Sequence, residues 1–223
     1  MRIFIIHYKV KKRVLSFNEN AILNMSMKYR GVLRVGIVLR LQGPFISLDA
    51  LQTAVYCLQR RHPFLRSRLR DNPTGHNIYL LEEDPLFRLK IREIPRKREQ
   101  HVDFWKQEWR KREKDTPVIG EGLVEFWLLQ DPYDCEDDHT PREIVIICEH
   151  SICDGISLST VAHELLLALG EEDKSLFNTS LDWPIPMEAA IKQTLTEWNI
   201  FKTVGKLLAI YSYWSKDSLS TYN

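Results

Sequence analysis

The most informative stretch of this sequence is Ile144-Val145-Ile146-Ile147-Cys148-Glu149-His150-Ser151-Ile152-Cys153-Asp154-Gly155. Its apolar first half predicts a buried β-strand, and the apolar period of residues 157–169 predicts a helix soon after it. His150 therefore follows the carboxyl end of a strand, where its ring can project into a cleft. Because imidazole titrates near neutrality, a histidine in such a place can take a proton from an attacking group.

A second informative stretch runs from Leu51 to Arg66, LQTAVYCLQRRHPFLR. Apolar residues recur here at steps of three and four, which is typical of a helix with one buried face. Ser47 is suited to cap the start of this helix. Pro63 limits its end, because the residue before a proline avoids helical geometry.

Together the two stretches resemble the chloramphenicol-acetyltransferase-like superfamily, which includes peptide-synthetase condensation domains and several classes of acyltransferase. The first stretch carries the His-x-x-x-Asp-Gly signature of that family, and the second is similar to the pattern L-x-x-A-x-x-x-L-x-x-R-H-P-x-L-R of condensation-type members. The resemblance covers about Val32 to Gly170. It implies an α/β fold, a two-layer sandwich of a mixed β-sheet with helices, corresponding to the N-terminal half-domain of these proteins.

The resemblance also implies an acyltransferase or condensation reaction. In the family the motif histidine, here His150, deprotonates a hydroxyl or an amine, which attacks a thioester of coenzyme A or of a carrier protein's phosphopantetheine arm. Asp154 is expected to pair with an arginine and to hold the loop, with Arg66 as the preferred partner and Arg61 as the alternative. Gly155 is expected to provide backbone geometry that a Cβ would hinder. The acyl thioester is a substrate, and no permanently bound cofactor is implied.

The sequence departs from the family pattern at two points. Many members have two adjacent histidines in the motif, and the first of them is Glu149 here. Pseudo-dimeric members have two similar halves with the substrate tunnel between them, and this chain matches one half only. Three hypotheses therefore stay open: an acyltransferase completed by a missing C-terminal half or another subunit, a short enzyme that self-associates, and a catalytically inactive half-domain that acts as a binding module.

The chain is interpreted as three parts. Residues 1–30, in which apolar residues show no clear periodicity, form an N-terminal extension. Residues 31–170 form the acyltransferase or condensation subdomain. The last part, 171–223, is a linker with an amphipathic helix over about 187–214, whose apolar side favours core packing over a membrane-lying helix. Within the subdomain, further apolar patterns predict a charged helix over 96–115 and strands at 32–41, 65–69, 78–81, 87–94, 123–129 and 143–149. The turn signal Asn72-Pro73-Thr74-Gly75 suggests that the strands at 65–69 and 78–81 form a hairpin, and Gly170 is positioned to end the helix over 157–169.

Composition excludes several other classes of protein. The 31 lysines and arginines against 30 acids give a net charge of +1, which argues against a nucleic-acid partner. No apolar stretch reaches membrane-spanning length. The four cysteines fit a reducing compartment, so a cytoplasmic location is expected. Cys148, His150, Cys153 and Asp154 lack the paired spacing of zinc sites, so no metal is expected.

Overall fold

The structure, a computed structural model, describes residues 10–30, 33–97, 103–112, 115–131, 142–170 and 174–197. The chain divides into two compact units, residues 1–184 and 185–223. The second unit contains α5 (Met187–Glu197). This helix begins where the amphipathic helix over 187–214 was predicted, and the rest of that prediction lies outside the described residues.

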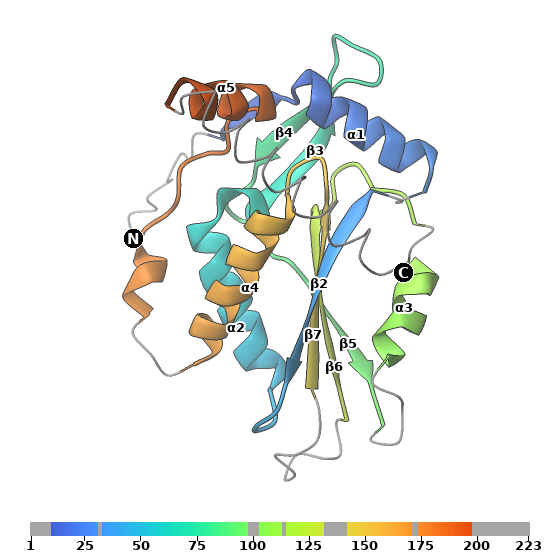
Figure 1. The fold of residues 1–223 in the computed structure, drawn as a ribbon, viewed down its shortest axis with the longest axis vertical. Coiled ribbons are helices and arrows are strands. Elements are labelled where there is room, and N and C mark those ends of the chain that lie inside the picture. The colour runs from blue at the N-terminus through green and yellow to red at the C-terminus, as the bar shows by residue number, and fades with distance from the viewer. Residues whose placement is uncertain are drawn as a thin grey trace, which may run out of the picture. The chain divides into compact units, whose positions relative to one another are not determined.

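A four-stranded sheet forms the centre of the first unit, in the order β2-β7-β6-β5 (Figure 1). β7 (Arg142–Glu149) pairs antiparallel with β2 (Arg34–Leu41) and with β6 (Val124–Gln130). β5 (Ile91–Pro95) runs parallel to β6 at the edge. The sheet is therefore mixed, and all eight residues of β7 are buried because helices cover both of its faces.

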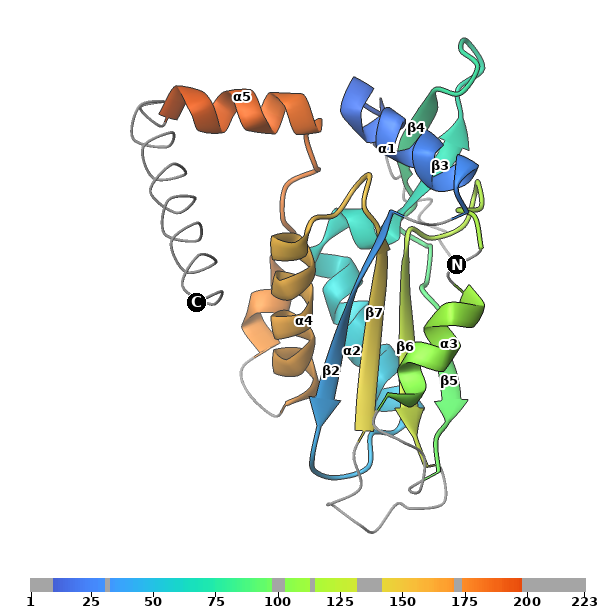
Figure 2. The same ribbon diagram turned by 45° about the vertical axis from the view of Figure 1, so that its right-hand side comes forward.

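Two helices cover one face of this sheet, and a third covers the other (Figures 1 and 2). α2 (Leu48–Arg61) and α4 (Gly155–Leu169) pack together on the first face, and their apolar side chains join those of the strands in one core. On the second face, tryptophans of α3 (Phe104–Arg112) pack over a smaller apolar cluster of the sheet. The α/β sandwich of a mixed sheet with helices is thus confirmed, with α3 as an addition.

A smaller sheet of β1 (Lys12–Val14), β4 (Tyr79–Glu83) and β3 (Ser67–Asp71), in that order, forms a second core with α1 (Phe17–Lys28). The hairpin of β3 and β4 is confirmed, and the predicted turn at 72–75 lies within the connection between the two strands. The buried apolar residues of this core are Leu15, Leu23, Leu69, Leu81 and Leu123. Two short 3₁₀ helices complete the unit, η1 (Pro63–Arg66) and η2 (Lys174–Asn178).

α1 and β1 lie within residues 1–30, where the sequence showed no clear period. A capping box starts α1: Ser16 N donates to the Glu19 carboxylate at 2.8 Å, and Glu19 N donates to Ser16 Oγ at 3.4 Å. A serine followed three residues later by a glutamate is a recognisable helix start. This pattern in the sequence could have predicted the start of α1.

Two predicted elements are shorter than expected. The strand expected at 87–94 begins only at Ile91, because the backbone before it bonds to a side chain of α2: Gln59 donates to the Phe87 carbonyl and accepts from the Leu89 N–H. The helix expected over 96–115 is described as 104–112, and residues 98–102 and 113–114 lie outside the described ranges. Across those ranges, no helix combines the length and the apolar character needed to cross a bilayer.

Candidate active site

His150 follows directly on the buried strand β7. Its backbone N–H donates to the carbonyl of Leu33 at 3.2 Å, which continues the pairing with the chain that leads into β2. Its side chain is half-buried, whereas the residues of β7 before it are buried. The sheet therefore fixes the backbone at this position, and the imidazole lies where the buried strand meets the surface.

The His150 ring is oriented by a backbone carbonyl three residues ahead. Nδ1 lies 2.8 Å from the oxygen of Cys153. A carbonyl oxygen can only accept, so Nδ1 carries the proton of the neutral ring and Nε2 keeps its lone pair. Within the described part of the chain the ring makes no other hydrogen bond. The geometry thus provides a fixed tautomer in which Nε2 can accept a proton.

Asp154 caps the N-terminus of α4. Its Oδ1 accepts from the N–H of Ser157 at 2.8 Å. Hydrogen bonds from Ser157 lower the pKa of Asp154, and the neighbouring charge of His150 lowers it further. The carboxylate is therefore ionised at neutral pH, and it anchors the turn that contains the Cys153 carbonyl.

The predicted ion pair between Asp154 and Arg66, or alternatively Arg61, is wrong. Arg66 Nε contacts Glu83 at 2.7 Å, because the β3–β4 hairpin places that carboxylate beside it. Arg61 Nε contacts Glu164 of α4 at 2.9 Å. Both arginines thus hold secondary-structure elements together. The carboxylate of Asp154 instead accepts a hydrogen bond from the backbone N–H of Ser157.

The expectation for Gly155 is also wrong. Gly155 is the first residue of α4, and its φ is not among the positive values of the described backbone. A Cβ built there would meet no heavy atom within 4 Å. The turn after His150 is therefore stabilised by the Asp154 cap, and the absence of a side chain at Gly155 leaves open space beside the motif.

Replacing Asp154 with alanine is expected to destabilise the protein by about 1 kcal/mol, the typical cost of losing an N-cap. The Ser157 N–H should lose protection from hydrogen exchange at the same time. Urea unfolding and amide exchange would measure the two effects. Asp154→Asn is the matched control, since its side-chain oxygen still accepts, and a loss as large in Asp154→Asn as in Asp154→Ala would contradict the capping role.

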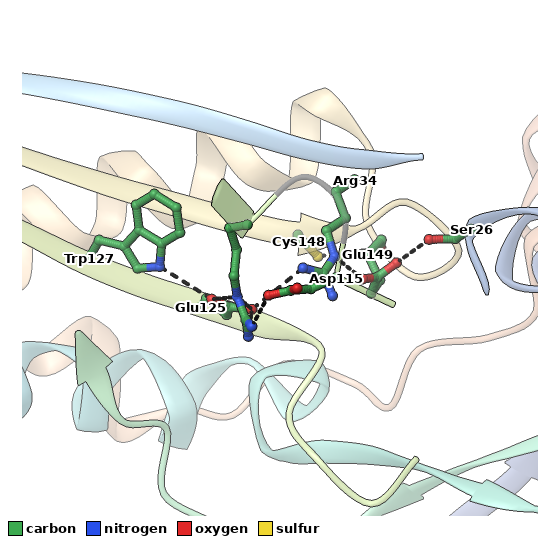
Figure 3. A network of polar contacts seen from close by, with 8 residues as sticks. Ser26, Arg34, Asp115, Glu125, Trp127, Cys148 and Glu149 are labelled. Atoms are coloured by element: carbon green, nitrogen blue, oxygen red, sulfur yellow. Dashed lines mark hydrogen bonds and ion pairs between the residues drawn. The ribbon is translucent and has the colours of Figure 1, made fainter. Parts of the chain in front are cut away.

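Glu149, which precedes His150, is enclosed by polar partners (Figure 3). The Arg34 Nε of β2 donates to one carboxylate oxygen, and Ser26 Oγ of α1 donates to the other at 3.0 Å. Arg34 also lies 3.7 Å from Glu125 of β6. Where many family members have a first histidine, this chain therefore has a buried carboxylate that joins α1, β2 and β7.

The same network continues along β6 to α3. Glu125 accepts from Arg112 at 2.7 Å and from the Trp127 indole at 3.2 Å, and Arg112 also contacts Asp115 (Figure 3). The sequence analysis noted Glu149 as a departure but missed its partners. The available signal was Arg34, one of only two charged residues, with Arg40, in the otherwise apolar strand β2.

A buried cluster connects the two sequence motifs. His62 Nε2 lies 2.7 Å from the Glu164 carboxylate, which also binds Arg61. Burial lowers the pKa of His62 below its ordinary value of 6.5, although the hydrogen bond to Glu164 acts in the opposite direction. The cluster fixes the end of α2 against the inward side of α4, so its role is to hold these two helices together.

The lowered pKa of His62 predicts a dependence of stability on pH. The folded protein binds a proton on His62 less readily than the unfolded chain does. The contribution of His62 to the free energy of unfolding is therefore fully present above the unfolded pKa near 6.5. It is lost as the pH falls from there through the folded pKa. Urea unfolding at pH 7.5 and 5.5 should show a smaller pH-dependent loss in His62→Gln than in the natural protein, and equal losses would contradict the assignment.

The described residues contain no cluster of three or more histidine, cysteine or acidic side chains that could hold a metal ion. Cys148 and Cys153 are buried free thiols on either side of His150. Burial raises the pKa of Cys148 well above its ordinary value, so this thiol is a poor nucleophile at neutral pH.

Comparison with known proteins gives matches at the level of solved structures. No protein-family model and no curated protein matches the chain. The structure described as holo T3CT aligns with a TM-score of 0.57 at 15% identity, over 84% of this chain and 40% of that one. The starter condensation domain of the rhizomide synthetase RzmA aligns with a TM-score of 0.55 at 15% identity, over 71% and 38%. This is the fold of a condensation-type half-domain.

An acetyltransferase shares the fold of the half-domain. The trichothecene 15-O-acetyltransferase TRI3 from Fusarium sporotrichioides aligns with a TM-score of 0.54 at 18% identity, over 70% of this chain and 34% of that one. The half-domain spans about two fifths of the length of the solved structures it matches. The resemblance inferred from the two motifs is confirmed at the level of the fold.

Proposed function

We propose that this half-domain contributes the general base of an acyl-transfer site, and that the base is His150. The observation that carries the proposal is the hydrogen bond from Nδ1 to the Cys153 carbonyl, which leaves Nε2 as the acceptor. A general base acts from a fixed position within hydrogen-bond reach of the proton that it removes. The imidazole of His150 is held in one tautomer at the surface end of a buried strand, with Nε2 as the atom that can accept the proton.

The proposed reaction transfers an acyl group from a coenzyme A or carrier-protein thioester to a hydroxyl or an amine. His150 Nε2 accepts the proton of the acceptor as its oxygen or nitrogen attacks the thioester carbonyl carbon. The carbon–sulfur bond then breaks, and the departing thiolate takes the proton from the imidazolium. The products are an ester or an amide and a free thiol, and His150 returns to its neutral form.

The surroundings of His150 support this role. Asp154 is ionised and its charge interacts with that of His150, so it stabilises the imidazolium formed during the attack. Arg34, Glu149 and Ser26 hold the strand end that precedes the ring. The base can therefore change its charge while its backbone stays in place.

The partners proposed for this site are a small-molecule acyl donor and acceptor, with a carrier protein as one source of the thioester. The similarity to condensation domains supports the carrier. Since the chain spans about two fifths of those structures, we propose that a further segment or a second copy supplies the opposite wall of the substrate site. A cytoplasmic location, where such donors are made, belongs to the same proposal.

The test is acyl transfer by the purified chain. Acetyl-coenzyme A and octanoyl-pantetheine would be offered with a panel of alcohols and amines, with free thiol measured by colorimetry and acylated product by mass spectrometry. The expected result is product that needs both donor and acceptor. Absence of product from every donor, in the chain alone and in complex with any partner it co-purifies with, would contradict the proposal.

A second candidate function is that of a catalytically inactive binding or interaction module. The observation in its favour is the span of the chain, which covers 34–40% of the solved structures it matches. In that case donors or acceptors would bind without turnover. Saturable binding of an acyl-pantetheine with no thiol release would support this candidate over the first.

A further inference from the structure

A cavity of about 370 Å³ lies among α2, the β3–β4 hairpin and η2, and no residue of the histidine motif lines it. Four of its lining residues are cations, Lys11, Arg60, Arg66 and Arg88, and one is an anion, Glu83. Cations placed this close together repel one another, which costs free energy, and a bound anion would relieve that repulsion. The charge balance of the wall therefore indicates an anionic ligand.

Arg66 is fixed by the protein itself. Its Nε donates to Glu83 at 2.7 Å, and its Nη1 donates to the backbone carbonyls of Gln59 and, at 2.9 Å, of Arg60. Glu83, the one carboxylate among the lining residues, is thereby paired with Arg66. The other three cations, Lys11, Arg60 and Arg88, have no carboxylate partner among the residues that line the cavity.

Arg88 is also held in position, and its partners among the described residues are all neutral. Its Nη1 donates to the carbonyls of Pro85 and Phe87, both at 3.0 Å, and its guanidinium lies 4.5 Å from the centroid of the Tyr56 ring. These contacts order the side chain without cancelling its charge. A site with its cations already in place loses less conformational entropy when a ligand binds.

Arg60 and Lys11 complete the cationic wall. Arg60 Nη2 lies 3.5 Å from Asn178 Oδ1, a neutral acceptor. The backbone of Lys11 is anchored, because its carbonyl accepts from Glu83 N at 2.8 Å. In the described residues, neither side chain forms an ion pair with a carboxylate.

The larger cavity nearby, of about 670 Å³, differs in this respect. Arg92 and Lys111 on its wall both contact Glu108, and Arg112 contacts Glu125. Three of the five cations on its wall are thus matched by acids of the protein, and the other two are Lys90 and Arg88, which also lines the smaller cavity. The larger cavity has three acids on its wall and the smaller cavity has one, so the excess of cations is greater in the smaller cavity.

We propose that the smaller cavity binds a small molecule that carries a phosphate group. Guanidinium groups match the geometry of phosphate oxygens and bind them with charge-assisted hydrogen bonds. The volume lies within the range of small-molecule sites, and the rings of Tyr56 and Phe177 on the same wall can contact an organic portion. This site goes beyond the proposed acyl transfer and does not depend on it.

The test is calorimetric titration of the full chain with inorganic phosphate and with adenosine 5′-monophosphate, at constant ionic strength. Saturable one-to-one binding is expected, and Arg60→Gln and Lys11→Gln should each weaken it about tenfold or more, the worth of one charge-assisted contact. Both side chains are exposed, so both variants should fold, and either one alone is sufficient. Lys28→Gln on α1 is the matched control, with the same change of charge outside the cavity.

Tighter binding of the nucleotide than of phosphate would indicate a phosphate ester as the ligand, and equal binding would indicate the free anion; both results support the site. Two results would overturn it. The first is the absence of saturable heat with either probe. The second is a loss of affinity in Lys28→Gln as large as in Arg60→Gln, which would show that net charge alone is responsible.

Discussion

His150→Ala is expected to slow acceptor-dependent thioester cleavage by about 10²–10⁴-fold, the range that general bases contribute. The ring nitrogen that would take the acceptor's proton is lost, and the neighbouring groups Asp154 and Cys148 do not replace it, since Asp154 is occupied in capping α4 and Cys148 is a buried thiol of raised pKa. Binding of the thioester should change much less than the rate, because the imidazole acts in the proton transfer.

The matched control for this variant is His163→Ala. His163 lies on the exposed side of α4, eight residues after Gly155, and has no place in the proposed reaction. It should leave the rate within about twofold of the natural protein, as is usual for a surface position. Equal rates in His150→Ala and in the natural protein, with both folded by circular dichroism, would rule out His150 as the base.

Arg34→Met is expected to lower the free energy of unfolding by about 3–5 kcal/mol, the cost of leaving one buried charge unpaired. The side chains of Arg34 and Glu149 are only 8% and 5% exposed, and the carboxylate of Glu149 would keep Ser26 as its one side-chain partner. Glu149 immediately precedes His150, so the strand end that carries the base should loosen. Urea unfolding would measure the loss of stability.

Arg70→Met is the matched control, because Arg70 also pairs with a glutamate, Glu82, but is 38% exposed. Surface pairs of this kind contribute about 0–1 kcal/mol. The double variant Arg34→Met with Glu149→Leu should recover part of the loss, since it removes both charges. A cost in Arg34→Met no larger than in Arg70→Met would contradict the structural importance of the buried network.

Local chemistry explains why much of the fold was predictable from sequence. Ser47 caps α2 as expected, and α2 ends at Arg61 ahead of Pro63. Gly170 follows the last residue of α4, and the hairpin of β3 and β4 forms around its predicted turn. Each of these features depends on residues a few positions apart. His150 was placed correctly at the end of β7 for the same reason.

The polar contacts of the site could not be predicted in this way. The carboxylates that bind Arg66 and Arg61 lie 17 and 103 residues away in the chain, and Ser26 reaches Glu149 over 123 residues. Sequence spacing carries no information about such pairs, so an expected partner for Asp154 was chosen by motif and proved wrong. The backbone acceptor of the His150 ring was equally invisible, because any residue can supply a carbonyl.

The tautomer of His150 is the most direct test of the central claim, and nitrogen NMR of histidine-labelled protein measures it. The spectrum of the His150→Gln variant would identify the signals of the His150 ring nitrogens, because only those signals would be missing. In the neutral ring, we expect a protonated Nδ1, bonded to the Cys153 carbonyl, and a bare Nε2. A protonated Nε2 with a bare Nδ1 would contradict the account, because the ring would then lack the Nε2 acceptor on which the proposed proton transfer depends.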